Sequence, residues 1–315
     1  MSNEVMRNDT RRRSSKQAVF EALSGKWVLA VLTIVPALLL FAFVNIVPIF
    51  WAITGSFYEI SAYSPEWTFT GVQHYADVLA NPELWASLSR SVVFASGAVT
   101  LQLVLGIGIA MLINRPFKGA TFIRAIVLLP YLTPTAIVSF IALWMANSQF
   151  GIINQILAQM GLIETYIPWF ASLDFAMIAV ILTSAWKWTI FVTIMVLARL
   201  QSIPDGLYEA AEVAGATKYQ LFRDVTLPNI KGVIFIVVLL RGLWMFNKFD
   251  IIYVLTQGGP RSITETAPIY AYEVAFVETQ LGKSAAISTL LFVMLVTVAV
   301  IYFKTLEPEQ EVRVE

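Results

Sequence analysis

Long apolar stretches alternate with short polar connections along the chain. Four of these stretches contain no Asp, Glu, Lys or Arg: residues 27–58, 91–114, 125–163 and 284–303. A helix rises about 1.5 Å per residue, so about 20 apolar residues cross the hydrocarbon core of a bilayer. Each stretch reaches that length, and the pattern therefore predicts membrane-spanning helices. A soluble protein with one very apolar core is the alternative, and stretches of this length argue against it.

The pattern predicts six spans in all. The fourth and fifth carry charged residues, but their apolar flanks and their ends rich in Trp and Tyr favour spanning. Pro130 and Pro134 lie in the third span and predict a kink, which either lines a pathway or serves packing. The predicted spans are residues 28–54, 91–114, 122–146, 175–199, 232–256 and 284–303.

Composition supports this class. The chain is 58% hydrophobic and 13% charged, whereas soluble domains carry about 25% charged residues. Its mean hydropathy is +0.72. The absence of cysteine excludes disulfides, thiol chemistry and cysteine metal sites. The single histidine, His74, lies in a polar connection and is expected at the surface rather than on a metal. The expected fold class is an all-α membrane protein with six transmembrane helices.

Basic residues lie on alternate sides of the predicted spans. The side opposite the termini holds only Arg90, Arg261 and Lys283. By the positive-inside rule both termini are cytoplasmic. We expect a basic N-terminal tail at 1–26, which orients the chain rather than binding nucleic acid, a transmembrane domain at 27–304 and a C-terminal tail at 305–315. The residues on the cytoplasmic side are Arg7, Arg11, Arg12, Arg13, Lys16, Lys26, Arg115, Lys118, Arg124, Arg199, Lys218, Arg223, Lys231, Lys304 and Arg313.

The predicted cytoplasmic connection at residues 200–231 contains an amphipathic helix–turn–helix. After the turn at 204–206, Asp205 is expected to cap a first helix over residues 207–214. Gly215 ends that helix, and Thr217 caps a second helix that runs to about residue 226. Pro228 is expected to stop the second helix before the fifth span begins.

The second helix carries an apolar stripe of Leu221, Phe222 and Val225, whereas the first has a small face of Ala210, Ala211 and Ala214. Such a face permits close approach of another surface. The alternative is a pair of helices lying in the lipid headgroups.

The sequence YEAAEVAGATKYQLFRDVTLP at 208–228 resembles the EAA signature of the membrane subunits of binding-protein-dependent type I ABC importers. That signature has EAA, three residues, Gly, nine residues, Ile, one residue and Leu-Pro, and here Val225 stands for the Ile. The segments LARLQSIPDGLYEAAEVAGA and WMFNKFDIIYVLTQGGP resemble the carbohydrate-uptake branch, which includes maltose and glycerol-phosphate permeases. The matching signature residues are Glu209, Ala210, Ala211, Gly215, Leu227 and Pro228.

The resemblance implies a permease subunit in the bacterial inner membrane. Its 200–231 loop would dock on a cytoplasmic ATPase, with Glu209 as the main polar contact. The resemblance further implies a dimer of ATPase subunits that bind ATP and Mg²⁺, a second, homologous permease subunit, and an extracytoplasmic solute-binding protein.

The sequence contains no ATP-binding motif of its own. Gly-Lys-Ser occurs at 282–284, but a P-loop needs another Gly five residues before Gly282, where Val277 stands. The sequence shows no catalytic constellation and no metal cluster, so we expect neither an enzyme nor a bound cofactor. An ion-coupled secondary transporter is the alternative of another class. It would need paired intramembrane acids, and Asp250 is the one acid placed well inside a predicted span.

Three basic residues fall inside predicted spans. An ionisable group at membrane depth costs about 2.5 kcal/mol or more on insertion scales, which marks it as a functional candidate. Arg241, Met245 and Lys248 follow helical spacing on one face. In the maltose permeases that the chain resembles, this region helps to line the sugar site. The candidate pathway residues are Lys187, Trp186, Arg241, Trp244, Met245, Asn247 and Lys248.

The cargo is left open between two kinds of sugar. Two cations on one face suit a sulfonated, phosphorylated or uronic sugar. A neutral oligosaccharide or polyol stays equally open, because Arg241 can instead pair with Asp250 or with helix-end carbonyls. Lys187 can likewise stack on its Trp neighbours or reach toward the membrane surface.

Overall fold

The structure, a computed structural model, describes residues 26–61, 66–114 and 119–306. Most of the N-terminal tail and of the C-terminal tail lies outside these residues, together with Arg115 and Lys118. The described chain is helical apart from one antiparallel pair of short strands. Its elements are α2 (Lys26–Phe41), η1 (Ala42–Ile46), α3 (Val47–Gly55), β1 (Tyr58–Glu59), β2 (Thr68–Phe69), α4 (Gln73–Ala80), α5 (Pro82–Asn114), α6 (Ala120–Leu132), α7 (Thr135–Met145), α8 (Ile152–Gln159), α9 (Ala176–Leu200), α10 (Asp205–Val213), α11 (Lys218–Gln220), η2 (Leu221–Thr226), α12 (Leu227–Phe246), α13 (Asp250–Thr256), α14 (Ala267–Phe276) and α15 (Leu281–Leu306).

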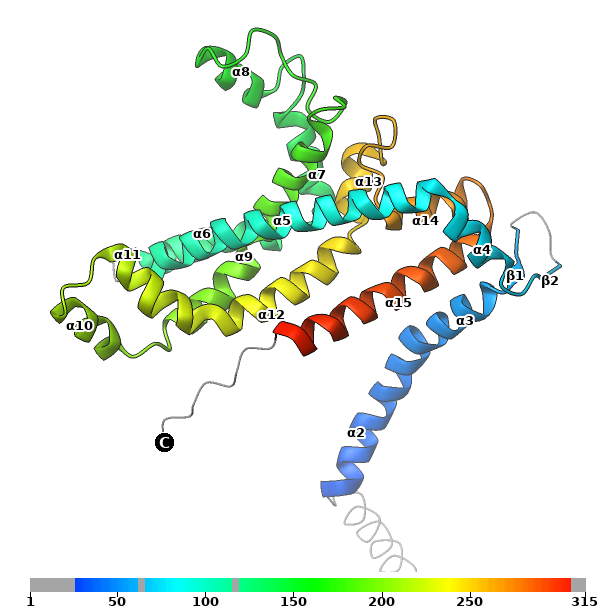
Figure 1. Cartoon of the computed structure of the whole chain (residues 1–315), viewed down its shortest axis with the longest axis horizontal. Helices are drawn as coiled ribbons and strands as arrows, with labels where there is room; N and C mark the ends of the chain where they lie inside the picture. The colour runs from blue at the N-terminus through cyan, green and yellow to red at the C-terminus, as the bar shows by residue number, and fades with distance from the viewer. Residues whose placement is uncertain (1–25, 62–65, 115–118, 307–315) are drawn as a thin grey trace, which may run out of the picture.

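Five helical segments of the described chain are long and apolar enough to cross a membrane, and a bent pair supplies a sixth. The all-α membrane fold is thereby confirmed. In Figure 1, α5, α9, α12 and α15 run along the length of the molecule, with α10 at one end and α4 and the strands at the other. The five segments are Ala30–Gly55, Pro82–Asn114, Ala176–Leu200, Lys218–Phe246 and Leu281–Thr305.

The third predicted span, 122–146, is not one kinked helix. Its two halves, α6 and α7, meet at an angle of 106°. Thr133 is extended, with ψ of 130°, because the ring of the following proline disfavours the helical region for the residue before it. Pro134 is itself extended and precedes the first residue of α7. The prediction of a bend here is right, but the bend is a break between two helices and not a kink within one helix.

The fifth predicted span, 232–256, is wrong at both ends. The helix runs from Lys218 to Phe246 without interruption, and the short helix α13 follows after a break. Pro228 does not stop the helix, because the preceding turn η2 is a wider π-helical turn, in which the Leu227 N–H donates to Phe222 O. A proline in the first turn of the following helix then lacks only an N–H that is dispensable there.

The core lies where α5, α9 and α12 pack together, with α14 and α15 beside them. One buried cluster fills the end near α13 and α14 and includes Phe94, Val180 and Ile269. A second cluster fills the end near α10 and includes Val196 and Ile230. The most apolar part of the first span has no buried residue, in contrast to its counterparts in α5 and α9. Its helix α2 diverges from the rest in Figure 1, so its apolar surface is left for lipid or another chain.

The paired strands pack against the start of α15. A Cβ atom on Gly282 would lie 2.0 Å from the Tyr58 carbonyl oxygen, so only glycine fits at this position. The Gly-Lys-Ser at 282–284 therefore serves close packing here. His74 lies beside this contact, 7% exposed, with its Nε2 3.2 Å from the Tyr58 carbonyl oxygen. The expectation of a surface histidine is wrong, because the connection around it folds back onto α15.

Candidate functional site

The 200–231 loop forms two helices joined by a turn at Gly215. Gly215 has a φ of +82°, which a residue without a Cβ adopts readily. Its N–H donates to Glu212 O, and the Ala216 N–H donates to Ala211 O, which together make a Schellman motif. The first helix, α10, therefore ends at the predicted glycine. It begins two residues earlier than expected, because the extended Pro204 is its N-cap residue; Asp205 is the first helical residue and not the cap.

The second helix starts at Thr217, as the sequence predicts, and the cap is a capping box with Gln220. The Gln220 N–H donates to Thr217 Oγ1 over 3.4 Å, and the Thr217 N–H donates to Gln220 Oε1 over 2.7 Å. These two bonds satisfy N–H groups that a helix start leaves without intrahelical partners. Arg199 closes the loop at its base, where its Nε donates to Asn229 O over 2.8 Å. The loop is therefore held in shape by its own residues.

The first helix of the loop has no buried residue. Glu209, Ala210 and Ala214 are exposed, whereas Ala211 is half-buried. Val213 is 90% exposed, which is unusual for an apolar side chain. The small and apolar surface expected for docking is thus largely exposed, and it includes the side chain of Val213, which is not part of the signature.

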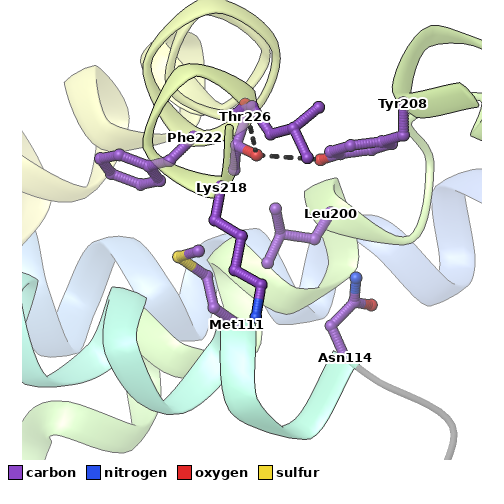
Figure 2. Close-up of a pocket in the computed structure, with 8 residues that line it drawn as sticks. Met111, Asn114, Leu200, Tyr208, Lys218, Phe222 and Thr226 are labelled. Atoms are coloured by element: carbon purple, nitrogen blue, oxygen red, sulfur yellow. Dashed lines mark hydrogen bonds between the residues drawn. The ribbon is translucent and has the colours of Figure 1, made fainter. Parts of the chain in front are cut away.

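A cavity lies between this helix and the membrane-facing helices. Its volume is about 240 Å³. Figure 2 shows Tyr208 reaching across it, with its hydroxyl 3.1 Å from Thr226 Oγ1, while Lys218 extends toward Met111 and Asn114. The contact of Tyr208 with Thr226 ties the first helix of the loop to the start of α12.

The three basic residues predicted inside spans converge on one aromatic ring. The charged groups of Lys187, Arg241 and Lys248 lie 4.8, 5.2 and 4.6 Å from the ring centre of Trp188, distances suited to cation–π attraction. We call these three residues with Trp188 the basic cluster. The cluster joins α9 to the end of α12 and to the break that follows it.

Arg241 is 1% exposed and has no carboxylate partner in the part of the chain described. Its Nε donates to Gln102 Oε1 over 2.7 Å, and its Nη2 lies 3.6 Å from Met245 Sδ. The rings of Phe191 and Trp244 each lie 5.7 Å from the guanidinium carbon. The pairing of Arg241 with Asp250 that the sequence left open is absent from these contacts, and an amide holds the guanidinium.

Lys187 binds the broken third span. Its Nζ donates to Thr133 O over 2.5 Å and to Pro130 O over 3.4 Å. These carbonyls belong to the C-terminal end of α6, where a helix leaves acceptors free and favours a positive charge. Lys248 pairs instead with Asp250, with 2.9 Å between Nζ and Oδ1.

Two of the candidate pathway residues lie apart from the cluster. Trp186 is 56% exposed and lines apolar hollows on another face of α9. Asn247 is exposed at the break between α12 and α13. The stacking of Lys187 on a Trp neighbour occurs at Trp188. Sequence reasoning missed Gln102. The signal for Gln102 was its amide inside the apolar stretch 91–114, whose side chain must find a partner in a membrane.

Metal chemistry has no evident site in residues 26–61, 66–114 and 119–306, where no three His, Cys, Asp or Glu side chains come together to hold an ion. Interrupted helices around a buried polar cluster, with an exposed helical loop at one end, are the architecture of a membrane transport protein.

Comparison with known proteins specifies the family. Residues 102–311 match the family described as binding-protein-dependent transport system inner membrane component. The chain is 34% identical over 291 residues to the trehalose/maltose transport system permease protein MalF of Thermococcus litoralis, covering 92% of this chain and 96% of that protein. It is 32% identical over 282 residues to the sulfoquinovosyl glycerol transport system permease protein SmoG of Agrobacterium fabrum, covering 89% and 91%.

The fold also matches a solved structure. A chain of a bacterial ABC transporter involved in the import of the acidic polysaccharide alginate superposes with a TM-score of 0.77 at 20% identity, covering 91% of this chain and 97% of that chain. This chain therefore belongs to the family of binding-protein-dependent inner membrane permeases, in its carbohydrate-uptake branch. It is a multi-pass protein of the bacterial inner membrane and a subunit of a sugar ABC importer, as the EAA signature indicates.

Proposed function

We propose that this subunit passes a sugar carrying an anionic group, and that the basic cluster receives that group. The observation that carries the proposal is the charge balance. Lys187, Arg241 and Lys248 bring three positive charges to one indole ring, and within the described residues Asp250 is the one acid paired with them. Charge at membrane depth is costly, and an anionic cargo offsets it while the cargo is bound.

The surroundings of the cluster suit a sugar. Trp188 and Trp244 offer ring faces on which a pyranose stacks, and Trp244 is 49% exposed. Lys248 is partly exposed as well, so this side of the cluster is the side from which a cargo reaches it. The relative named for sulfoquinovosyl glycerol supports a sulfonated sugar as one member of this class.

A neutral sugar is the second candidate, and two observations favour it. A relative that matches 92% of this chain is named for trehalose and maltose. Each basic group of the cluster also has a partner within the chain, namely an amide, two carbonyls and a carboxylate. On that alternative the cluster only joins helices. The ion-coupled transporter is disfavoured by the family to which the chain belongs.

We further propose that the 200–231 loop docks on a cytoplasmic ATPase. ATP and Mg²⁺ bind to that partner, which would act as a dimer, and Glu209, Ala210 and Val213 contact it. Their exposure supports this role. On the other side of the membrane a solute-binding protein delivers the sugar. A homologous second permease covers the unburied first span, and both termini of this chain face the cytoplasm.

The ligand of the cognate binding protein tests the cargo. We expect an acidic sugar to bind it, and to stimulate ATP hydrolysis by the complete complex in liposomes. Arg241→Gln should lower uptake of that sugar about 10- to 100-fold, because hydrogen bonds to a charged group contribute about 1.5–3 kcal/mol. If only neutral disaccharides bind, the proposal of an anionic cargo is refuted, while the permease role stands.

A further inference from the structure

Gln102 is a buried amide that bonds to Arg241 of the basic cluster and to Met245 beside it. It lies in α5 and is 0% exposed. Its Oε1 accepts from Arg241 Nε over 2.7 Å, and its Nε2 donates to Met245 Sδ over 3.5 Å. Met245 also contacts Arg241 Nη2, so the three side chains form a closed triangle. Gln102 thus fixes where the guanidinium lies between α5, α9 and α12.

The orientation of the amide is determined by chemistry. The Arg241 Nε is only a donor, so the Gln102 atom that faces it must be the carbonyl oxygen. Turning the amide over would place its NH₂ group against the guanidinium and leave the Met245 sulfur without a donor. The amide therefore holds Arg241 in one position.

The amide also leaves the charge of Arg241 intact. A glutamate has nearly the same shape as glutamine and would accept the same bond, but it would neutralise the guanidinium. Pairing with a carboxylate does occur at another basic residue of the cluster, where Lys248 is paired with Asp250. Two N–H groups of Arg241, on Nε and Nη2, have partners here among the described residues, out of the five that a guanidinium carries.

We propose that Gln102 is a specificity-determining positioning residue: it orients Arg241 without neutralising it, and so sets the preference of the pathway for anionic over neutral sugars. This inference rests on the proposed function. On this inference, the preference for an anionic cargo depends on a residue of α5, whereas the residues proposed to touch the cargo lie on neighbouring helices.

The test compares two sugars that differ in one group. Methyl glucuronide carries a carboxylate where methyl glucoside carries a hydroxymethyl group. Both are titrated into the assembled importer complex, without the binding protein, and binding is followed by tryptophan fluorescence, since Trp188 and Trp244 flank Arg241. The variants are Gln102→Glu and Gln102→Met. Gln155→Glu makes the same substitution at a half-buried position of α8, outside the basic cluster, and is the control.

We expect the wild-type complex and the Gln155→Glu control to bind the glucuronide more tightly than the glucoside. In Gln102→Glu that preference should fall about 10- to 100-fold, the range of one hydrogen bond to a charged group. In Gln102→Met the affinity for the glucuronide should fall while the affinity for the glucoside stays. The ratio of the two affinities is the readout, because a purely structural role would change both together.

Three outcomes contradict the inference, and they are distinguishable. If the wild type prefers the glucuronide and Gln102→Glu keeps that preference, the role of Gln102 is refuted and the anionic cargo stands. If Gln102→Glu does not assemble, Gln102→Met decides, and wild-type affinity for the glucuronide in that variant overturns the inference. If the wild type shows no preference, the anionic cargo and the role of Gln102 fall together.

Discussion

The proposed function depends on two polar regions, the 200–231 loop and the basic cluster. The hydrogen bonds within the loop join residues close in sequence, whereas those within the cluster join residues far apart in sequence. In the loop, Thr217 bonds to Gln220 and Gly215 to Glu212, three residues away in each case. In the cluster, Arg241 bonds to Gln102 across 139 positions and Lys187 to Thr133 across 54. The short-range bonds of the loop hold its two helices locally, while Arg199 at the end of α9 closes its base. The geometry of the cluster depends on how α5, α6, α9 and α12 pack, so we expect it to change if those helices move.

The largest expected effect comes from a substitution that disrupts the local structure of the 200–231 loop. Gly215→Pro cannot adopt the φ of +82° and loses the N–H that donates to Glu212 O. The two helices of the loop would no longer meet at their angle. We expect uptake to fall more than about 100-fold, the scale of a misplaced functional element, while the protein stays in the membrane and the ATPase still turns over. Uptake and ATP hydrolysis are measured together in liposomes.

Gly206→Ala is the matched control, because a Cβ at Gly206 meets no atom within 4 Å and its φ is not positive. Glu209→Lys should uncouple hydrolysis from uptake in the same way, by reversing the charge at the proposed ATPase contact. Normal uptake by a well-expressed Gly215→Pro variant would refute the coupling role of the loop.

The second expected effect comes from removing a long-range bond of the basic cluster. Lys187→Met removes the charge that binds the carbonyls of Pro130 and Thr133 at the end of α6. We expect the free energy of unfolding to fall by about 1.5–3 kcal/mol, the contribution of hydrogen bonds to a charged group, together with a loss of uptake. Thermal unfolding of the purified complex measures the first. Trp186→Leu, at the neighbouring exposed position, should leave stability nearly unchanged, and an equal loss in both variants would contradict this account.

A smaller effect measures the cap of the second loop helix. Thr217→Ala removes the hydroxyl that accepts from the Gln220 N–H. The expected loss is about 1 kcal/mol for that helix, seen as faster hydrogen exchange in residues 218–222 with the cluster unaffected. Thr217→Ser should restore protection. A change in exchange around Arg241 would show that the two regions are not independent.

The smallest expected effect concerns Glu265. Its carboxyl group is buried like the cluster, but it lacks the close long-range partner that Arg241 has. Burial raises the pKa of its carboxyl group above 4.5, and Glu83 and Glu278 add to the shift, against the hydrogen bond from Ser262 and the charge of Arg90. A raised pKa means that the folded state holds the proton more tightly. The stabilising contribution of Glu265 is therefore full below pH 4.5 and is lost as the pH rises through the folded pKa.

Consequently the contribution of Glu265 should raise the melting temperature as the pH falls from 7 toward 4.5, and Glu265→Gln should reduce that rise. Glu212→Gln, at an exposed carboxylate, is the control. An unchanged pH profile in Glu265→Gln would remove this assignment. The pH profile of the melting temperature also measures how strongly burial affects the ionisation of a carboxyl group that has no close long-range partner.

The sequence predicted the loop well because its signals are local. Spacing placed the Gly215 end of the first helix and the Thr217 cap of the second correctly, since both act within one helical turn. It failed at Pro228, where proline was expected to end a helix and a π-helical turn instead accommodates it. The third span failed in a related way. Two prolines predict a bend, but the spacing does not give its angle, and it does not show that Lys187 in another helix binds the freed carbonyl of Thr133.

The cluster could be predicted only in part. Helical spacing put Arg241 and Met245 on one face, and the structure keeps them in contact. The partner of Arg241 could not be deduced, because Gln102 and Asp250 were both polar groups inside spans and the choice depends on how α5 packs against α12. His74 shows the same limit, since burial there results from the return of the chain onto α15.

The unbroken helix from Lys218 to Phe246 gives the protein a mechanical property. It spans 29 residues, or about 43 Å at 1.5 Å per residue. One end begins at the Thr217 cap in the loop proposed to meet the ATPase, and Arg241 lies near the other end. A continuous helix changes its length little because each turn is hydrogen-bonded to the next, so the Thr217 cap and Arg241 are carried by one element. If the loop docks on the ATPase as proposed, a movement imposed at Lys218 would reach Arg241 through this single helix, within which Pro228 lies instead of ending it.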